Sequence, residues 1–245
     1  MEVMRKPPRH HSSKNRPVQK PRKVINLPLL EFKKLNYQTQ DREILRDISL
    51  DVEAGDFISI VGPSGSGKST LLKLASHLIS PSSGDMLFKG KNYLDYPPGD
   101  LRKNIGYCFQ TPHLFTGNVL DNLAFPYAIR HKKPNLDRIH ALLDLFHMSR
   151  GYLSREVHAL SGGEKQRIAL VRTMVFMPEV LLLDEVTSAL DRDNAALVEK
   201  AMADLNAQGT TILSVTHKIH QEKHYANKLL TLDQGKLVSF QEVLQ

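Results

Sequence analysis

The segment from residue 62 to residue 70 carries the residues whose types and spacing most directly predict chemistry. It reads Gly62-Pro63-Ser64-Gly65-Ser66-Gly67-Lys68-Ser69-Thr70, which has the spacing Gly-x-x-x-x-Gly-Lys-Ser. Glycines let successive backbone N–H groups turn toward a phosphate, and a helix beginning behind them adds its positive end. Lys68 is expected to reach the β- and γ-phosphates, and the Ser69 hydroxyl to bind Mg²⁺. The segment therefore predicts a loop that binds a nucleoside triphosphate.

Two consecutive carboxylates, Asp184 and Glu185, follow the apolar run Val180–Leu183. A parallel strand delivers its carboxyl end to the ligand crevice of its sheet, where the phosphate loop is also expected. Asp184 is therefore expected to bind Mg²⁺ through its coordination shell. Glu185 is expected to accept a proton from the attacking water as a general base. Two acids after an apolar strand are also typical of a first helical turn, but the phosphate loop favours the catalytic interpretation.

A third segment combines a helix start with paired glycines: Leu160-Ser161-Gly162-Gly163-Glu164-Lys165-Gln166-Arg167. Ser161 and Glu164 have the spacing of a capping box that opens a helix. A capping box needs no glycine pair, and Gly162 and Gly163 leave backbone N–H groups bare at a positive helix end, which suits a phosphate. Because the first loop already holds a triphosphate, this segment is expected to serve the nucleotide of another molecule.

The segment Leu160–Arg167 is similar to the signature motif of the ABC (ATP-binding cassette) ATPases, and the resemblance extends from about residue 30 to residue 245. Members of this family hydrolyse ATP with Mg²⁺. The resemblance implies two cassettes that close head to tail, with each ATP between one phosphate loop and the opposite Ser161–Gly163. The expected partner in this dimer is a second copy of the chain.

Four further positions resemble functional residues of the family. Tyr37 resembles the aromatic residue that stacks on adenine, although a tyrosine at a strand end is also commonly a packing residue. Gln110 resembles the Q-loop glutamine, which contacts Mg²⁺ and water and responds to the membrane partner. Asp191 closes the segment Ser188–Asp191, which resembles the D-loop at the dimer seam. His217 resembles the switch histidine that touches the γ-phosphate.

The elements that must position these residues alternate between strands and helices. Buried strands are expected at residues 56–61, 105–109, 180–183, 211–215 and 228–232, the last leading into a short hairpin through Gly235. Helices are expected from Gly67 through Leu78 and at residues 195–208. Such alternation predicts an α/β fold with a mostly parallel sheet. The resemblance identifies this fold as a P-loop NTPase with a RecA-like core.

Two regions depart from this alternation. Residues 30–33, 48–52 and 86–89 are expected to be further strands, and the first two alternate apolar with polar side chains, which predicts an antiparallel β subdomain. Residues 112–163 carry helical signals at 119–128, 135–146 and 151–156, which predicts an inserted α-helical subdomain.

The excess of basic over acidic residues in the chain comes from residues 1–23. Of 33 Lys and Arg and 26 Asp and Glu, residues 1–23 hold eight basic residues and one acid, which leaves 25 of each for the remainder. Residues 1–26 are also rich in proline, so a disordered tail is predicted, with the cassette spanning 27–245. A basic arm that touches anionic lipid or RNA is an alternative to a solvated extension. No specific nucleic acid partner is expected for the globular part.

No stretch approaches the roughly 18 uninterrupted apolar residues of a membrane-spanning helix. Any channel is therefore expected on a separate integral membrane permease, with this chain peripheral at the cytoplasmic face. The single cysteine, Cys108, excludes an intrachain disulfide, favours a reducing compartment, and is expected to be a small buried apolar residue.

Cassettes of this family work in several kinds of protein complex. A single cassette without a coiled-coil insertion favours a transporter over the ABC proteins of translation or chromosome maintenance. Residues 108–115, 119–126 and 176–185 are similar to small bacterial ABC cassettes of iron export, and this region is expected to form the groove for the permease's coupling helix. The sequence predicts an ATPase subunit that drives iron or metal export. The alternatives are an importer cassette for a small polar solute and, less favoured, a non-transport ABC ATPase.

Overall fold

The structure is a computed structural model that describes residues 27–216 and 225–243. The smaller sheet is antiparallel and has the order β2-β1-β4-β5, formed by β1 (Leu30–Gln38), β2 (Glu43–Val52), β4 (Ser83–Phe88) and β5 (Lys91–Asn92). The larger sheet has the order β10-β9-β3-β8-β7-β6, formed by β3 (Phe57–Val61), β6 (Ile105–Cys108), β7 (Val180–Asp184), β8 (Thr211–Val215), β9 (Lys228–Asp233) and β10 (Lys236–Glu242). The helices are α1 (Lys68–Ala75), α2 (Pro98–Asn104), α3 (Val119–Ala128), α4 (Leu136–Leu145), α5 (Gly162–Met174) and α6 (Arg192–Ala207).

The larger sheet is parallel except for the hairpin between β9 and β10. Every residue of its inner strands β3, β7 and β8 is buried, as expected for parallel strands covered on both faces. The α/β fold with a mostly parallel sheet and a separate antiparallel sheet is confirmed. The parallel arrangement brings the carboxyl ends of β3, β6, β7 and β8 to one edge, where the predicted site residues follow.

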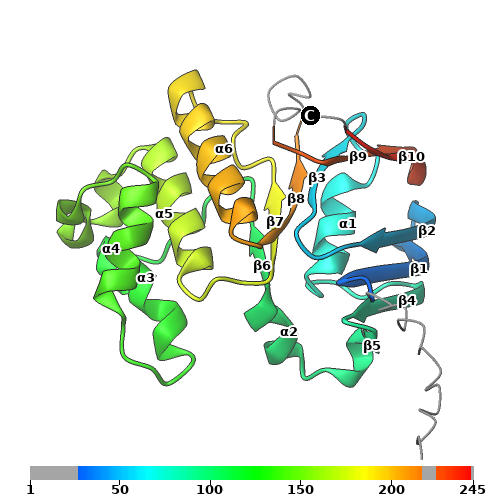
Figure 1. The fold of residues 1–245 in the computed structure, drawn as a ribbon, viewed down its shortest axis with the longest axis horizontal. Coiled ribbons are helices and arrows are strands. Elements are labelled where there is room, and N and C mark those ends of the chain that lie inside the picture. Colours follow the sequence, from blue (N-terminus) through cyan, green and yellow to red (C-terminus); the bar gives the residue numbers. More distant parts are fainter. Residues whose placement is uncertain (1–26, 217–224, 244–245) are drawn as a thin grey trace, which may run out of the picture.

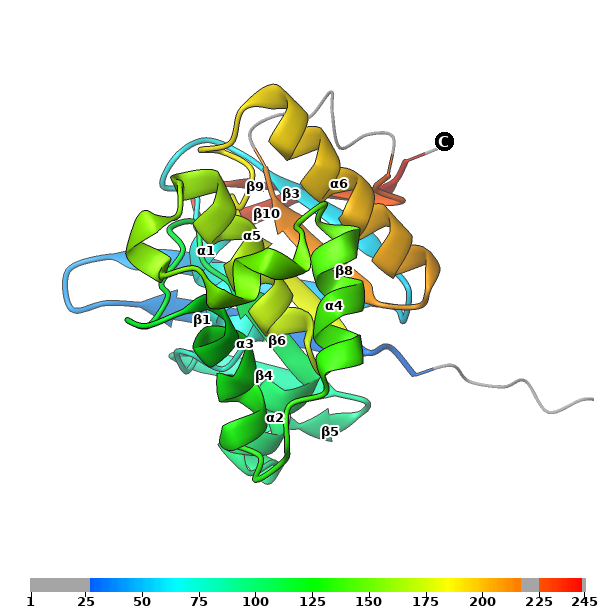
Figure 2. The same ribbon diagram turned by 90° about the vertical axis from the view of Figure 1, so that its left-hand side faces the viewer.

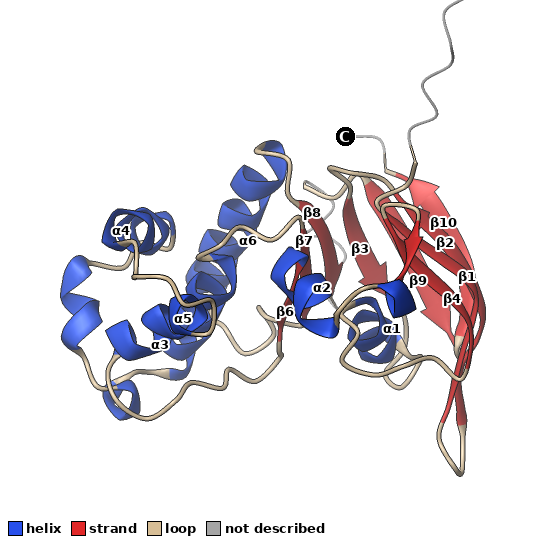
Figure 3. Ribbon diagram, turned by 90° about the horizontal axis from the view of Figure 1, so that it is seen from below, coloured by secondary structure: helices blue, strands red, loops and turns tan. Residues whose placement is uncertain are grey.

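Two apolar clusters divide the molecule into layers. One joins α1 to both sheets through residues such as Leu71, Leu74 and Phe32, and Figure 3 shows α1 between the sheets. The other packs α3, α4, α5 and α6 on the opposite face of the larger sheet, through residues such as Leu143 and Val198 (Figure 1). The helical region therefore shares its core with the larger sheet.

Helices α3 and α4 lie beside α5 (Figure 2), and Figure 3 shows them on the side of the larger sheet away from the antiparallel sheet. The predicted bounds of α3, residues 119–128, are confirmed. The helix begins at Val119 because Asn118 and Asp121 form a reciprocal capping box there. The expected helix at 151–156 is instead a short 3₁₀ helix over Arg150–Ser154. The extent of a helical subdomain over 112–163 stays a prediction.

The first helix is shorter than predicted. It ends at Ala75, because His77 adopts a left-handed conformation with φ of 54° and the Leu78 N–H donates to Lys73 O at 2.9 Å. These features form a Schellman motif, which closes a helix. The exposed Leu78 thus lies beyond the helix. The His77 ring packs edge-on to Tyr93 at 5.8 Å, and its buried Nδ1 has no hydrogen-bond partner among the described residues.

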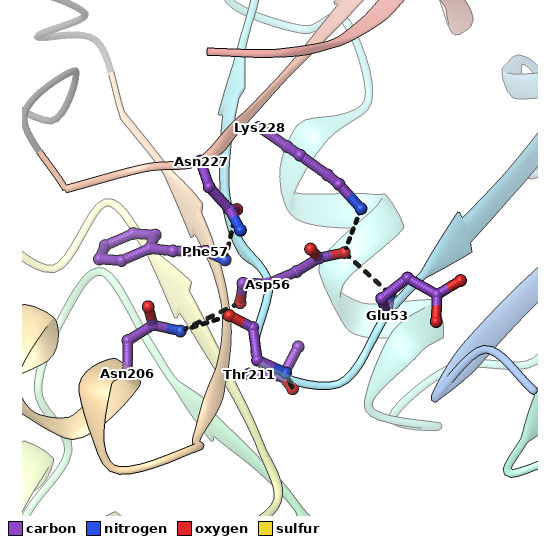
Figure 4. A network of polar contacts seen from close by, with 8 residues as sticks. Glu53, Asp56, Phe57, Asn206, Thr211, Asn227 and Lys228 are labelled. Atoms are coloured by element: carbon purple, nitrogen blue, oxygen red, sulfur yellow. Dashed lines mark hydrogen bonds and ion pairs between the residues drawn. The ribbon is translucent and has the colours of Figure 1, made fainter. Parts of the chain in front are cut away.

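A polar network fastens the end of the larger sheet opposite the site (Figure 4). The buried Asp56 carboxylate accepts hydrogen bonds from Lys228 Nζ at 2.7 Å and from the Glu53 backbone N–H at 2.8 Å. The Asn206 amide donates to Thr210 O at 2.8 Å, and the Asn227 side chain accepts from the Phe57 N–H at 2.9 Å. This pairing satisfies buried polar groups that would otherwise be costly, and it links α6 to strands β3, β8 and β9.

Candidate nucleotide-binding and hydrolysis site

The loop between β3 and α1 has a backbone that its glycines make possible. Gly62 and Gly67 have φ of 144° and 102°, which side chains with a Cβ rarely adopt. A Cβ at Gly62 would lie 1.9 Å from Leu232 O, and one at Gly67 would lie 2.6 Å from Leu45 Cδ2. The loop is thus packed tightly against β9 and β2, so its shape is set before any ligand arrives.

Lys68 turns its ammonium group into this loop. The side chain is buried, and its Nζ donates to Gly62 O at 2.9 Å and Pro63 O at 2.8 Å. No carboxylate in the described part of the chain forms an ion pair with it. The buried Ser66 Oγ also has no hydrogen-bond partner among the described residues. A buried cation without a paired carboxylate and a buried hydroxyl without a hydrogen-bond partner, both among the described residues, fit a phosphate group.

The carboxylate of Asp184, at the end of β7, is held on both oxygens. Ser69 Oγ donates to its Oδ1 at 2.7 Å, and Tyr107 Oη donates to its Oδ2 at 2.7 Å. Burial raises the pKa of the Tyr107 hydroxyl, and the hydrogen bond to Asp184 raises it further, so this hydroxyl remains a donor at neutral pH. The contact with Tyr107 has no counterpart in the sequence predictions.

Glu185 has an unusual backbone conformation. Its φ of 51° lies in the left-handed region, which costs a residue with a Cβ about 1 kcal/mol. Its N–H donates to Val215 O at 3.2 Å, which ties the turn after β7 to β8. Gln110 Nε2 donates to Glu185 Oε2 at 2.8 Å. The residues following β6 and β7 thus place an amide against a carboxylate beside the phosphate loop.

A cleft of about 470 Å³ is lined by Lys68, Ser69, Gln110 and Glu185, whereas the buried Asp184 is not among its lining residues. Two of the residues that line it, Arg42 and Ile44, were not predicted. Tyr37 is not among the described residues that line the cleft; its half-buried ring packs against the apolar cluster around α1. Adenine stacking by Tyr37 therefore stays a prediction. The lining residues are Arg42, Ile44, Ser64, Gly65, Gly67, Lys68, Ser69, Thr70, Gln110 and Glu185.

The predicted capping box at Ser161 is confirmed at the start of α5. The Glu164 N–H donates to Ser161 Oγ at 3.2 Å, and Glu164 Oε2 accepts from the Ser161 N–H at 2.7 Å. The Tyr152 hydroxyl also donates to Glu164, and this bond, followed by those from Ser161, lowers the pKa of the Glu164 carboxyl. Ser161 and Gly162 are exposed, so the helix start is open to a second molecule.

The structure separates this helix start from the nucleotide cleft of its own chain. None of the cleft-lining residues in the described ranges comes from 161–163. Asp191 is the exposed N-cap of α6, and hydrogen bonds from the backbone and then the side chain of Asn194 lower the pKa of its carboxyl. His217 lies outside the described residues, directly after Thr216, whose N–H donates to Ile60 O. Its predicted contact with a γ-phosphate stays a prediction.

Known proteins are similar to this chain in sequence and in fold. The family model described as ABC transporter matches residues 45–188, a range that includes the phosphate loop, the signature segment and both carboxylates. The chain is 44% identical over 208 residues to the protein named Probable iron export ATP-binding protein FetA from Escherichia coli (strain K12); the match covers 84% of this chain and 92% of that protein. The chain belongs to the ABC transporter family. It is an ATP-binding cassette, and its activity is the hydrolysis of ATP.

Solved ABC cassettes have the same fold. The structure of cbiO1 from Clostridium perfringens, part of the ABC transporter complex cbiONQ, matches with a TM-score of 0.78 and 30% identity, covering 88% of each chain. The ATP-binding cassette MJ0796, in a dimeric post-hydrolysis state bound to ADP and Pi, matches with a TM-score of 0.79 and 26% identity, covering 88% of this cassette and 99% of that chain. The dimeric state of this neighbour agrees with the exposure of Ser161 and Gly162 at the start of α5.

Two further features complete the description of this cassette. No helix among the described residues is long and apolar enough to cross a membrane. Cys108 is buried, as predicted, and burial raises the pKa of its thiol to about 11.

Proposed function

We propose that this cassette is the ATPase subunit of a transporter that exports iron or a related metal, with its channel on a separate membrane protein. The observation that carries the proposal is the 44% identity over 92% of FetA, a protein named as a probable iron export ATP-binding protein. Fold similarity alone does not distinguish cargo, because cassettes of different transporters share the fold. The choice of export over import therefore depends on this sequence identity.

In this proposal Ser69, Gln110 and Asp184 would hold Mg²⁺. Mg²⁺ prefers oxygen ligands, which the Ser69 hydroxyl, the Gln110 amide and the Asp184 carboxylate offer. The hydrogen bond between Ser69 and Asp184 supports the assignment, because it brings two of these oxygen ligands together. Bound there, the ion would neutralise charge on the phosphates. Lys68 and the loop N–H groups hold the phosphates, and Glu185 orients the attacking water and accepts its proton. Gln110 holds the Glu185 carboxylate and thereby limits its rotation.

Two copies complete each other's sites. Ser161 and Gly162 are exposed, and none of the described residues that line the nucleotide cleft comes from 161–163, which supports binding of the opposite copy's ATP by Ser161, Gly162 and Gly163. Backbone N–H groups at the start of α5 present a positive end to the triphosphate. Asp191 is exposed on the turn before α6 and is proposed to lie at the seam between the copies.

The permease is proposed to dock in a groove of about 330 Å³ between β6, α2, α3 and α5. Its lining includes Phe109, Phe115 and Phe125, each more than two-fifths exposed. The lining also contains four basic residues and no carboxylate, namely Arg102, Lys103, Arg130 and Arg172. An entering segment would therefore combine apolar anchor residues with a carboxylate, and the cassette would lie at the cytoplasmic face of the membrane.

This partnership can be tested by purifying the tagged chain from its own cells in mild detergent. A stoichiometric multi-span membrane protein that co-purifies is expected, and Arg130→Glu should reduce its yield at least tenfold without changing ATP binding. The control is Val238→Asp, an exposed apolar position on β10 outside the groove. Recovery of ribosomes or soluble proteins alone would overturn the transporter assignment while leaving the ATPase activity intact.

The cargo needs a separate experiment. Cells that overexpress the chain with its membrane partner should retain less iron after an iron load than cells expressing the Glu185→Gln chain with the same partner. Equal iron retention in both, with the complex assembled, would contradict iron export. Measuring zinc, manganese and cobalt in the same samples would show whether another metal takes its place.

A further inference from the structure

Tyr107 contacts the Asp184 carboxylate from outside the nucleotide cleft. Tyr107 is one of the residues that line the groove proposed for the permease, and its ring packs against Phe109 with centroids 4.6 Å apart. It does not line the nucleotide cleft. Its hydroxyl nevertheless lies 2.7 Å from Asp184 Oδ2, on the oxygen opposite the one that accepts from Ser69. One tyrosine therefore joins the wall of the groove to the carboxylate of the proposed magnesium site.

The backbone pairing explains how the contact arises. Tyr107 lies beside Leu182 in the parallel pairing of β6 with β7, so its side chain and that of Asp184, two residues further along, stand on the same face of the sheet. The torsion that rotates a carboxylate about its last bond is soft, and a single donor leaves much of that freedom. Two donors on opposite oxygens fix the plane of the group.

We propose that Tyr107 is a positioning residue that holds the Asp184 carboxylate in the orientation that Mg²⁺ requires. The inference rests on the magnesium site of the proposed function. Each carboxylate oxygen can accept more than one hydrogen bond, so Ser69 and Tyr107 leave lone pairs for the ion or its water. Partners of metal ligands orient them, and removing one such partner weakens metal affinity by about 10- to 100-fold.

The alternative is that the hydroxyl only stabilises the fold. Tyr107→Phe distinguishes the two roles, because it removes the hydroxyl and keeps the ring against Phe109. The matched control is Tyr96→Phe, since the Tyr96 hydroxyl donates to a backbone oxygen, Phe88 O, at 2.9 Å and not to Asp184. Melting temperatures in EDTA establish that each variant is folded and how much stability each hydroxyl contributes.

The test measures binding of a fluorescent ATP analogue in EDTA and in Mg²⁺, in the Glu185→Gln background so that no turnover occurs. The gain in affinity brought by Mg²⁺ is expected to fall about tenfold in Tyr107→Phe, with metal-free affinity unchanged. Tyr96→Phe should keep the full gain. Mn²⁺ titrations followed by electron paramagnetic resonance should show the same weakening in the nucleotide complex.

Several outcomes would overturn the inference. An unchanged Mg²⁺ gain in folded Tyr107→Phe would reduce its role to packing, and so would an equal loss of affinity with and without metal. If Asp184→Asn also leaves the Mg²⁺ gain intact, then the proposed magnesium site itself is wrong. If Asp184→Asn abolishes the gain while Tyr107→Phe does not, only the positioning role fails.

Discussion

Gln110 Nε2 lies 2.8 Å from Glu185 Oε2, so the segment after β6 holds the carboxylate that follows β7. Both side chains line the nucleotide cleft. The amide nitrogen donates and the carboxylate oxygen accepts, so each group fixes the orientation of the other. The group proposed to activate water is thus held as an acceptor by a side chain of the same cassette.

The first prediction concerns Glu185→Gln. The neutral amide cannot accept the proton of water, so turnover should fall by about 10²- to 10⁴-fold while ATP binding persists. Phosphate release and equilibrium binding of an ATP analogue measure the two effects, and size-exclusion chromatography should show an ATP-dependent dimer. Glu242→Gln, an exposed change on β10, is the control. Normal hydrolysis by Glu185→Gln would remove this residue from the mechanism.

The second prediction uses complementation between two inactive chains. Ser161→Arg places a bulky cation at the exposed start of α5, and Lys68→Ala removes the buried ammonium of the phosphate loop. Each homodimer should be inactive, with ATP binding retained by Ser161→Arg. Mixing the two variants should restore part of the ATPase activity, because a mixed dimer contains one intact composite site. Ser154→Arg, another exposed serine, is the control; failure of the mixture to recover would mean that the signature segment acts within its own chain.

The third prediction compares two glycines of the same loop. Gly62→Ala adds a Cβ within 1.9 Å of Leu232 O at a φ of 144°, whereas Gly65→Ala faces open space at a φ of 76°. Clash and backbone strain together should lower the free energy of unfolding by about 3 kcal/mol at Gly62, and strain alone by about 1 kcal/mol at Gly65. Urea denaturation without nucleotide measures both. Equal effects would show that the contact with β9 does not constrain the loop.

The fourth prediction is a pH dependence at His77. Burial, with a smaller contribution from Arg102, lowers the pKa of this imidazole from its ordinary value of 6.5, so the folded state favours the neutral ring. The unfolded chain takes up the proton more readily, so stability is retained above pH 6.5 and lost as the pH falls below it. His77→Asn should flatten this loss, since asparagine also tolerates the left-handed conformation.

Urea midpoints between pH 5 and pH 8 provide the measurement. His147→Asn is the matched control, because His147 has a similar φ of 51° and is exposed. Its pH profile should follow that of the unmodified chain. Parallel profiles for all three proteins would show that protonation of His77 does not contribute to acid destabilisation.

Much of the fold could be predicted because the local sequence pattern of many elements matches the structure that they adopt in the folded chain. Helix α3 begins at a capping box formed by Asn118 and Asp121, and strand β7 is apolar from Val180 to Leu183. Helix α2 was missed because Pro97-Pro98-Gly99 is typical of a turn, although proline is tolerated in the first turn of a helix. The end of α1 was missed because the left-handed residue that closes it is a histidine rather than a glycine.

The candidate site divides in the same way. Residues in motifs, such as Lys68, Asp184 and Glu185, lie where strand ends and loop spacing place them. Tyr107 and Arg42 carry no motif, and only the three-dimensional pairing of strands reveals what they face. The spacing of residues along the chain cannot predict the role of a side chain when that role depends on a neighbouring strand.

The burial of Cys108 has a practical consequence. With its pKa near 11 and its sulfur enclosed, the chain's one native thiol stays unreactive at neutral pH. A cysteine introduced at the exposed Val238 would then be the one position available to a maleimide dye. Movements between two copies during an ATP cycle could be followed by fluorescence without first deleting a native cysteine, so the labelled cassette would keep its natural core.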